Sequence, residues 1–231
     1  MGKYYHRFET QADMEAVRYS ENYTEPWLSV VEGGRLDYNI GTNGHEFVNL
    51  GLPSGTLWAR YDVGVELEYA YWGSQYLWGH TSMWTNYTSS PTWTDYRFGT
   101  SANSMTKYNA SDGKTVLDLE DDAVHVAWGG KWRMPTKEDC IELYQNCTCT
   151  TIRINPDQTT YKQAKFTSKI NGNYIIFPSE TFSIWTSSVS VYSTYQYAYA
   201  FRQYSESNKY YIDVANALRY YKKQVRGVIK P

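Results

Sequence analysis

Excess charge of one sign and long apolar runs are both missing from this chain, and each absence excludes a class of protein. The 22 basic and 24 acidic residues leave a formal net charge of -2 at pH 7, with no basic stripe. That balance argues against a nucleic-acid partner. The mean hydropathy is -0.62. Since no apolar run approaches the ~20 residues of a membrane-spanning helix, we expect no membrane insertion.

Cysteine is scarce as well. Cys140, Cys147 and Cys149 are an odd set, which cannot form a closed disulfide framework. The Cys147-Thr148-Cys149 spacing is too tight for a metal knuckle, and no histidine follows at zinc spacing. A cysteine nucleophile paired with His125 is an alternative, but we expect His125 to be an ordinary helix residue. We therefore predict buried or idle thiols, and no catalytic residue, metal ligand or cofactor.

The start of the chain differs from the rest. Residues 1–7 contain no apolar stretch behind their basic residues, so they do not read as a secretory signal. Residues 1–44 are too few to form their own core. We predict that residues 1–44 form an N-terminal attachment arm and that residues 45–231 form the main domain.

The main domain reads as a mixture of helices and short strands. Two helices are expected, one over residues 119–128 and one that follows Pro135, with Thr136 as its cap and Asp139 in a box-like position. Residues 80–115 are rich in Ser, Thr, Asn and Gly, which predicts a long irregular segment. Strand-like pieces follow at residues 161–167, 174–177, 184–187, 197–201, 210–214 and 224–229. This order predicts an α+β domain.

A series of separate motifs then brings a known family into view. They are FVNLGLPSGTLWA at residues 47–59, VG at 63–64, YWG at 71–73, DDA at 121–123, WGGKWRMPT at 128–136, TSK at 167–169, NGN at 171–173, WTSS at 185–188, RYY at 219–221 and VR at 225–226. In these motifs the chain resembles the Bacteroidetes major paralogous family. The resemblance implies a C-type-lectin-like fold, which is shared with formylglycine-generating enzymes and with the variable proteins of diversity-generating retroelements, including bacteriophage tropism determinants.

The sequence also departs from that family and its relatives. Gly227 stands where the family often has proline. The stretch Trp185-Thr186-Ser187 replaces the Trp-Asn-Asp of calcium-binding lectins, and Asn155-Pro156-Asp157 reads as a turn rather than as calcium ligands. Formylglycine-generating activity needs a cysteine pair near the C-terminal end of its domain, but this chain has no cysteine after Cys149.

Aromatic residues are what the chain has in abundance, with 24 Tyr, 9 Trp and 7 Phe. Nine of the tyrosines fall between Tyr192 and Tyr221 and are interspersed with Ser, Asn, Arg and Lys. Tyrosine offers a large contact area at low conformational cost, which suits a recognition surface. We predict that the ligand-binding residues are Tyr195, Tyr197, Tyr199, Arg202, Tyr204, Tyr210, Asn216, Arg219 and Tyr221.

Some aromatic residues are expected to pack inside the domain instead. The spacing of Tyr195, Tyr197, Tyr199 and Phe201 puts all four on one face of a strand. We assign Phe201 to the core, leave core and surface equally open for the three tyrosines, and expect Tyr204, Tyr210, Asn216, Arg219 and Tyr221 to be exposed. The tryptophans assigned to the core are Trp58, Trp72, Trp128 and Trp132.

Three functions are compatible with these observations. The first is a receptor-binding or adhesive component of a bacteriophage particle, with a C-terminal region of the kind that retroelements diversify. It would recognise a bacterial surface protein or glycan, dock its arm on the virion and associate as a homo-oligomer such as a trimer. The second is a bacterial surface or secreted lectin-like module, and the third is an enzyme of the formylglycine-generating type. We expect the first, in a virion-associated or cell-exterior location and without enzymatic activity.

Overall fold

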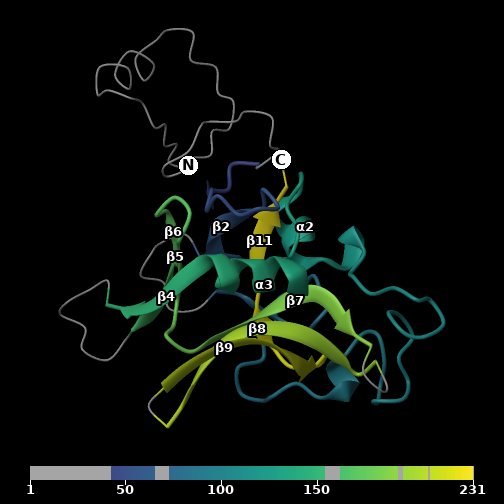
Figure 1. Cartoon of the computed structure of the whole chain (residues 1–231). Helices are drawn as coiled ribbons and strands as arrows, with labels where there is room; N and C mark the ends of the chain where they lie inside the picture. The colour runs from purple at the N-terminus through teal and green to yellow at the C-terminus, as the bar shows by residue number, and fades with distance from the viewer. Residues whose placement is uncertain (1–42, 66–72, 154–161, 192–194, 208, 231) are drawn as a thin grey trace, which may run out of the picture.

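The computed structural model describes residues 43–65, 73–153, 162–191, 195–207 and 209–230 (Figure 1). Apart from residues 43 and 44, the predicted attachment arm lies outside these ranges, as do Trp72 and the Asn155-Pro156-Asp157 stretch. The described part is a mixed α+β structure made mostly of strands, with two α-helices, so the expected α+β class is confirmed.

The described strands form three sheets. One sheet has the order β1–β2–β11, and its strands are Phe47–Val48, Leu57–Asp62 and Arg226–Ile229. A second has the order β3–β10–β7–β8–β9, and its strands are Gln75–Tyr76, Lys223–Gln224, Phe182–Ser190, Tyr197–Glu206 and Lys209–Leu218. The third has the order β4–β5–β6, and its strands are Cys147–Ile152, Gln163–Ser168 and Tyr174–Phe177. All described pairings are antiparallel except the one between β10 and β7.

The helix α3, Lys137–Asn146, begins where the sequence predicts. The Thr136 hydroxyl accepts a hydrogen bond from the backbone N–H of Asp139 at 3.2 Å, and the Asp139 carboxylate accepts one from the backbone N–H of Thr136 at 2.9 Å. This reciprocal capping box satisfies two N–H groups that a helix start otherwise leaves unpaired.

The single helix expected over residues 119–128 is wrong in detail. A 3-10 helix, η2, covers Leu119–Asp121, and a short α-helix, α2, covers Ala123–Trp128. Asp122 separates them, because its backbone is extended and its carboxylate accepts hydrogen bonds from the backbone N–H groups of Val124 and His125. An aspartate that caps a helix in this way ends the preceding turn and starts a new one.

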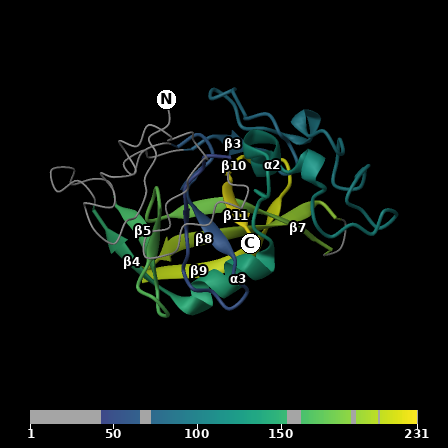
Figure 2. The same ribbon diagram turned by 90° about the horizontal axis from the view of Figure 1, so that it is seen from above.

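The middle of the five-stranded sheet is covered on both faces. The helix α3 lies along one face of β7, β8 and β9 (Figure 1). On this α3 face, Phe201 packs in one core cluster with Cys140 and Leu143 of the helix. The opposite face carries Trp185, Ala198 and Ala200, which pack in a second cluster with side chains from the residue 77–117 region. The irregular coil that contributes them lies on the side of the molecule away from β4 and β5 (Figure 2).

Tryptophans contribute to both core clusters. Trp58 and Trp132 are fully buried, each in a different cluster, which confirms their assignment to the core, and Trp128 is partly buried against the cluster that contains Trp132. Gly227 lies against two of these rings, since a Cβ built on it would be 2.5 Å from Trp128 and 2.7 Å from Trp132. The indole packing therefore requires glycine at this position in β11.

Candidate functional site

The predicted tyrosine surface is divided between the two faces of the sheet. In β8, Tyr197 and Tyr199 alternate with Ala198 and Ala200, so both tyrosines lie on the α3 face, as does Phe201. Phe201 is buried in the core, as expected. Arg202 and Tyr204 follow Phe201 with the opposite parity and project from the opposite face. The residues predicted from the sequence therefore do not form one surface.

The predicted residues on the α3 face contact other residues of the domain. The Lys137 ammonium lies 4.9 Å from the centre of the Tyr199 ring. Asn216 is exposed and is the direct cross-strand partner of Tyr199. Tyr210 lies near the turn between β8 and β9, and its hydroxyl donates a hydrogen bond to Glu180. The predicted residues of the α3 face therefore lie at separate points along the sheet and do not form one cluster.

Tyr195 and Tyr221 lie outside the strands. Tyr195 has a φ of 56° and precedes β8, so the expected alternation starts at Tyr197 and not at Tyr195. Its side chain is half-buried against the core. Tyr221 follows β9, is exposed as expected, and makes an edge contact with Tyr220 at 5.0 Å between ring centres.

Arg219 corrects the prediction most clearly, because its side chain is 0% exposed. Its guanidinium donates hydrogen bonds to the backbone carbonyls of Lys107 at 3.2 Å and Tyr108 at 2.6 Å, and lies 4.7 Å from the ring centre of Trp78. A buried arginine is tolerated only where its donors are satisfied. Arg219 therefore joins the irregular segment to the sheet and is not available to a ligand.

On the face opposite α3, a line of polar side chains crosses four adjacent strands. Lys223 of β10 donates a hydrogen bond to Ser183 of β7 at 2.8 Å. Ser183 is the direct cross-strand neighbour of Arg202 in β8, and Arg202 is the neighbour of Asp213 in β9. We call these four residues the polar row. None of the four belongs to the core clusters, and all four are half-buried.

Two aromatic rings extend the polar row at one side. Tyr204 and Tyr211 are cross-strand partners whose rings stack at 5.5 Å and 24°. We call them the tyrosine pair. The guanidinium of Arg202 lies 4.7 Å from the ring centre of Tyr204, and Tyr211 is 42% exposed. Together the polar row and the tyrosine pair form the candidate recognition surface, which offers cations, one carboxylate, a hydroxyl and aromatic rings.

Within the candidate recognition surface, Arg202 and Lys223 are in different electrostatic situations. Arg202 binds Asp213 through two hydrogen bonds of 2.7 and 2.9 Å. Lys223 makes no ion pair with any carboxylate of the described ranges, and its ammonium lies 5.2 Å from the ring centre of Trp185. Burial, and then the nearby charge of Arg202, lower the pKa of Lys223 to about 8. The ammonium is thus the less compensated of the two cations.

Of the candidate recognition surface, only Arg202 and Tyr204 are among the residues predicted from the sequence. Tyr211 and Asp213 have the i, i+2 spacing of one strand face, a signal that was available. Ser183 and Lys223 are 40 positions apart and meet through the parallel pairing of β7 and β10. No local pattern indicates that meeting.

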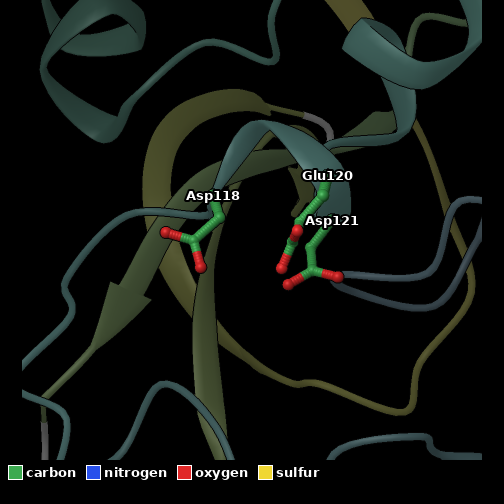
Figure 3. A group of neighbouring side chains, drawn as sticks. All are labelled: Asp118, Glu120 and Asp121. Carbon is green, nitrogen blue, oxygen red and sulfur yellow. The ribbon is translucent and has the colours of Figure 1, made fainter.

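A separate acidic cluster lies around η2. Asp118, Glu120 and Asp121 bring carboxylate oxygens within 4.8 Å of one another (Figure 3). The Lys107 ammonium lies 2.9 Å from Asp118 and 3.0 Å from Glu120 and also binds Asp121, while Arg97 lies 2.9 Å from Asp121. Lys114 also binds Asp118, so three protein cations already neutralise the cluster. We interpret it as an ion-pair network that fastens the irregular segment to η2.

The cysteines are poorly suited to nucleophilic chemistry. Burial raises the pKa of the Cys147 thiol to about 12 and that of the Cys149 thiol to about 11. Cys140 is fully buried, and its pKa is also raised. At neutral pH the protonated thiol dominates at all three positions, whereas nucleophilic attack needs the thiolate. His125 has a ring nitrogen 3.0 Å from the Trp132 carbonyl oxygen, a contact within its own helix–turn region.

Comparison with protein-family models, curated protein sequences and solved structures gives no match for this chain. Among the helices of the described ranges, none has the length and apolar character needed to cross a membrane.

Proposed function

We propose that this chain is a non-enzymatic binding protein that recognises a molecule on a bacterial surface through the candidate recognition surface. It acts as a receptor-binding or adhesive component of a bacteriophage particle, with residues 1–44 as the attachment arm. A C-type-lectin-like fold for residues 45–231 is part of the proposal. Two helices and mostly antiparallel strands are compatible with that fold, and the motifs at residues 47–59 and 128–136 argue for it.

The observation that carries the proposal is the position of the tyrosine pair beside Arg202. The strands β8 and β9 are paired in unbroken register from Tyr197–Leu218 to Glu206–Lys209. A continuous ladder holds Arg202, Tyr204 and Tyr211 on a rigid support. Rigid aromatic and arginine side chains lose little conformational entropy on binding, and they dominate the energy of many interfaces.

The proposal is tested by binding of the purified chain to intact bacterial cells and to their isolated surface polysaccharides. The test variant is the double substitution Tyr204→Ser and Tyr211→Ser. The control variant is Tyr87→Ser, because Tyr87 is 76% exposed and lies in the irregular segment. We expect saturable binding by the original chain. The affinity of the double variant should be lower by about tenfold or more, and the affinity of the control should be unchanged. A metal chelator should leave the binding unchanged.

Two results would contradict the proposal. Equal binding by the original chain and the double variant would remove the candidate recognition surface from the function. Loss of binding in the Tyr87 variant alone would move the contact to the irregular segment. Both variants should remain folded, since a cross-strand tyrosine pair contributes only about 0.2–1 kcal/mol to stability.

A further inference from the structure

Lys223 is a partly buried cation that has no anionic partner among the residues that the structure describes. Its ammonium has three N–H donors, and the described residues provide one hydrogen-bond acceptor, the Ser183 hydroxyl. Trp185, which lies under the ammonium, is fully buried. A partly desolvated charge is costly unless a partner of opposite sign compensates it. No carboxylate of the described ranges is close enough to do so.

The surrounding charges strengthen this imbalance. Arg202 and Asp213 neutralise each other through their two hydrogen bonds. The polar row as a whole carries two cations and one anion, so one positive charge is left at the Lys223 end. That positive end lies three strands away from Asp213, since the order of strands is β10, β7, β8, β9. Adjacent strands are about 4.8 Å apart, so the Asp213 carboxylate is too distant to pair with Lys223.

We propose that the Lys223 ammonium and the Ser183 hydroxyl bind a carboxylate group of an acidic polysaccharide. The uronate carboxylate accepts hydrogen bonds from both groups, and the neighbouring sugar rings extend along the polar row towards the tyrosine pair. This inference rests on the proposed function and names the ligand class of the same surface.

Three features favour an acidic sugar over other anions. A single uncompensated ammonium matches a group of one negative charge, whereas a phosphate group would bring up to two. Tyr204 and Tyr211 offer aromatic faces, which suit the apolar face of a sugar ring, and hydroxyls that can form hydrogen bonds. The polar row also alternates donors and acceptors, from the Lys223 ammonium to the Asp213 carboxylate, as the hydroxyl groups of a sugar polymer require.

The test measures binding of the full chain to immobilised polygalacturonate. A second surface carries the same polymer with its carboxyl groups reduced to alcohols, and a third carries polyglutamate. The test variant is Lys223→Met, which keeps an unbranched side chain but removes the charge. The matched control is Lys222→Met, at the adjacent position and outside the polar row. A measurement that needs no variant is displacement of the original chain by free galacturonate in comparison with free galactose.

We expect the original chain and the Lys222 variant to bind polygalacturonate about tenfold or more tightly than the reduced polymer, since a hydrogen-bonded charge pair is lost in the latter. The Lys223 variant should bind both polymers equally and weakly. Galacturonate should displace the chain at lower concentration than galactose. Unchanged affinity in the Lys223 variant, or equal binding of the two polymers by the original chain, would overturn the carboxylate subsite.

The outcomes separate this inference from the proposed function. Binding to polyglutamate alone, or to none of the three polymers, overturns the acidic-polysaccharide ligand. If the chain then still binds cells through Tyr204 and Tyr211, only the further inference fails. If cell binding is also absent or independent of the tyrosine pair, the proposed function fails as well. Should the Lys223→Met variant not fold, Lys223→Gln and the displacement measurement decide the question.

Discussion

Arg202 and Asp213 face each other directly across β8 and β9, and the guanidinium binds the carboxylate through two hydrogen bonds of 2.7 and 2.9 Å. The same guanidinium lies 4.7 Å from the ring centre of Tyr204. Asp213 therefore fixes the position of Arg202 beside the tyrosine pair. The two side chains are 40% and 37% exposed, so solvent screens their attraction.

The first prediction concerns the energy of this ion pair. A double-mutant cycle with Arg202→Ala and Asp213→Ala should give a coupling energy of about 0.2–1 kcal/mol, as exposed pairs do. The measurement is urea unfolding of the two single variants, the double variant and the original chain. A coupling energy above about 2 kcal/mol would contradict the view that the pair positions Arg202 more than it stabilises the fold.

The second prediction concerns Arg219. Replacing it by alanine leaves the carbonyls of Lys107 and Tyr108 without their donor and removes the packing against Trp78. We expect the free energy of unfolding to fall by about 2–4 kcal/mol, measured by urea unfolding. The control Lys222→Ala should change stability by less than about 0.5 kcal/mol. Ligand binding by the folded fraction of the Arg219 variant should be unchanged. A variant of full stability that loses binding would restore Arg219 to the contact surface.

The third prediction concerns the buried pair of Asp62 and Arg226. Their side chains are 0% and 1% exposed, and the guanidinium also donates to the Ile176 carbonyl at 2.8 Å. Burial raises the pKa of Asp62, while the charge of Arg226 opposes that change. Arg226→Met should lower the free energy of unfolding by about 3–5 kcal/mol, because it leaves an uncompensated buried carboxylate.

A matched control for that change is Arg60→Met. Arg60 also pairs with a carboxylate, that of Glu46 at 3.6 Å, but both groups are partly exposed. Arg60→Met should lower the free energy of unfolding by less than about 1 kcal/mol. Equal losses for Arg60 and Arg226 would show that burial of the ion pair does not set its energetic importance.

Local signals explain which parts of the fold could be predicted. The capping box of α3 depends on Thr136 and Asp139, three positions apart, and the sequence predicts it correctly. The separation of η2 from α2 depends on Asp122, whose carboxylate also accepts a hydrogen bond from the backbone N–H of Met134, 12 positions away. No local sequence pattern indicates a contact between residues so far apart in the chain, so the sequence predicts one continuous helix.

The candidate site was only partly predictable for a similar reason. Alternation assigned Tyr197 and Tyr199 to one face but could not say which face, because both sides of β8 are covered near Ala198 and Ala200. Local sequence predicts a surface position for Arg219, because the residues that bury it are 111 and 112 positions away. Composition predicts a recognition role for the hairpin, and the tertiary contacts show which of its side chains are exposed and which are buried.

The fourth prediction concerns acid stability around Asp118. Hydrogen bonds from Lys114 and Lys107 lower the pKa of this carboxyl from 3.8 to about 2. A folded-state pKa below the unfolded value adds stability at pH values above the unfolded pKa, and that contribution is lost as the pH falls through the folded pKa. Asp118→Asn should therefore reduce stability at pH 7 but not at about pH 2.

The measurement is the urea midpoint of the original chain and the Asp118 variant across that range. Glu206→Gln is the control, because Glu206 is exposed at the end of the hairpin. The difference between Asp118→Asn and the original chain should shrink as the pH falls, while the control follows the original chain throughout. A difference that stays constant with pH would show that the Lys107 and Lys114 contacts do not act through the charge of Asp118.

The fifth prediction concerns the pH dependence of binding at Lys223. The groups around its ammonium are Arg202, which lowers the pKa, and the uncharged Ser183 and Trp185, while Tyr76 is the direct cross-strand partner of Lys223 in β3. With a pKa of about 8, the free chain loses the positive charge of Lys223 as the pH rises through that value. A uronate carboxylate stays ionised over this range, since carboxyl groups titrate near ~4.

Affinity for polygalacturonate should therefore be constant below about pH 7 and fall as the pH rises through the pKa of Lys223. Bound carboxylate favours the charged ammonium, so the pKa of Lys223 in the complex must lie above that of the free chain. Binding at a series of pH values between about 6 and 9.5 tests this, with Lys222→Met expected to follow the original chain and Lys223→Met expected to show weak binding without the fall. A fall that persists in the Lys223 variant would assign the titration to another group and separate Lys223 from recognition of the carboxylate.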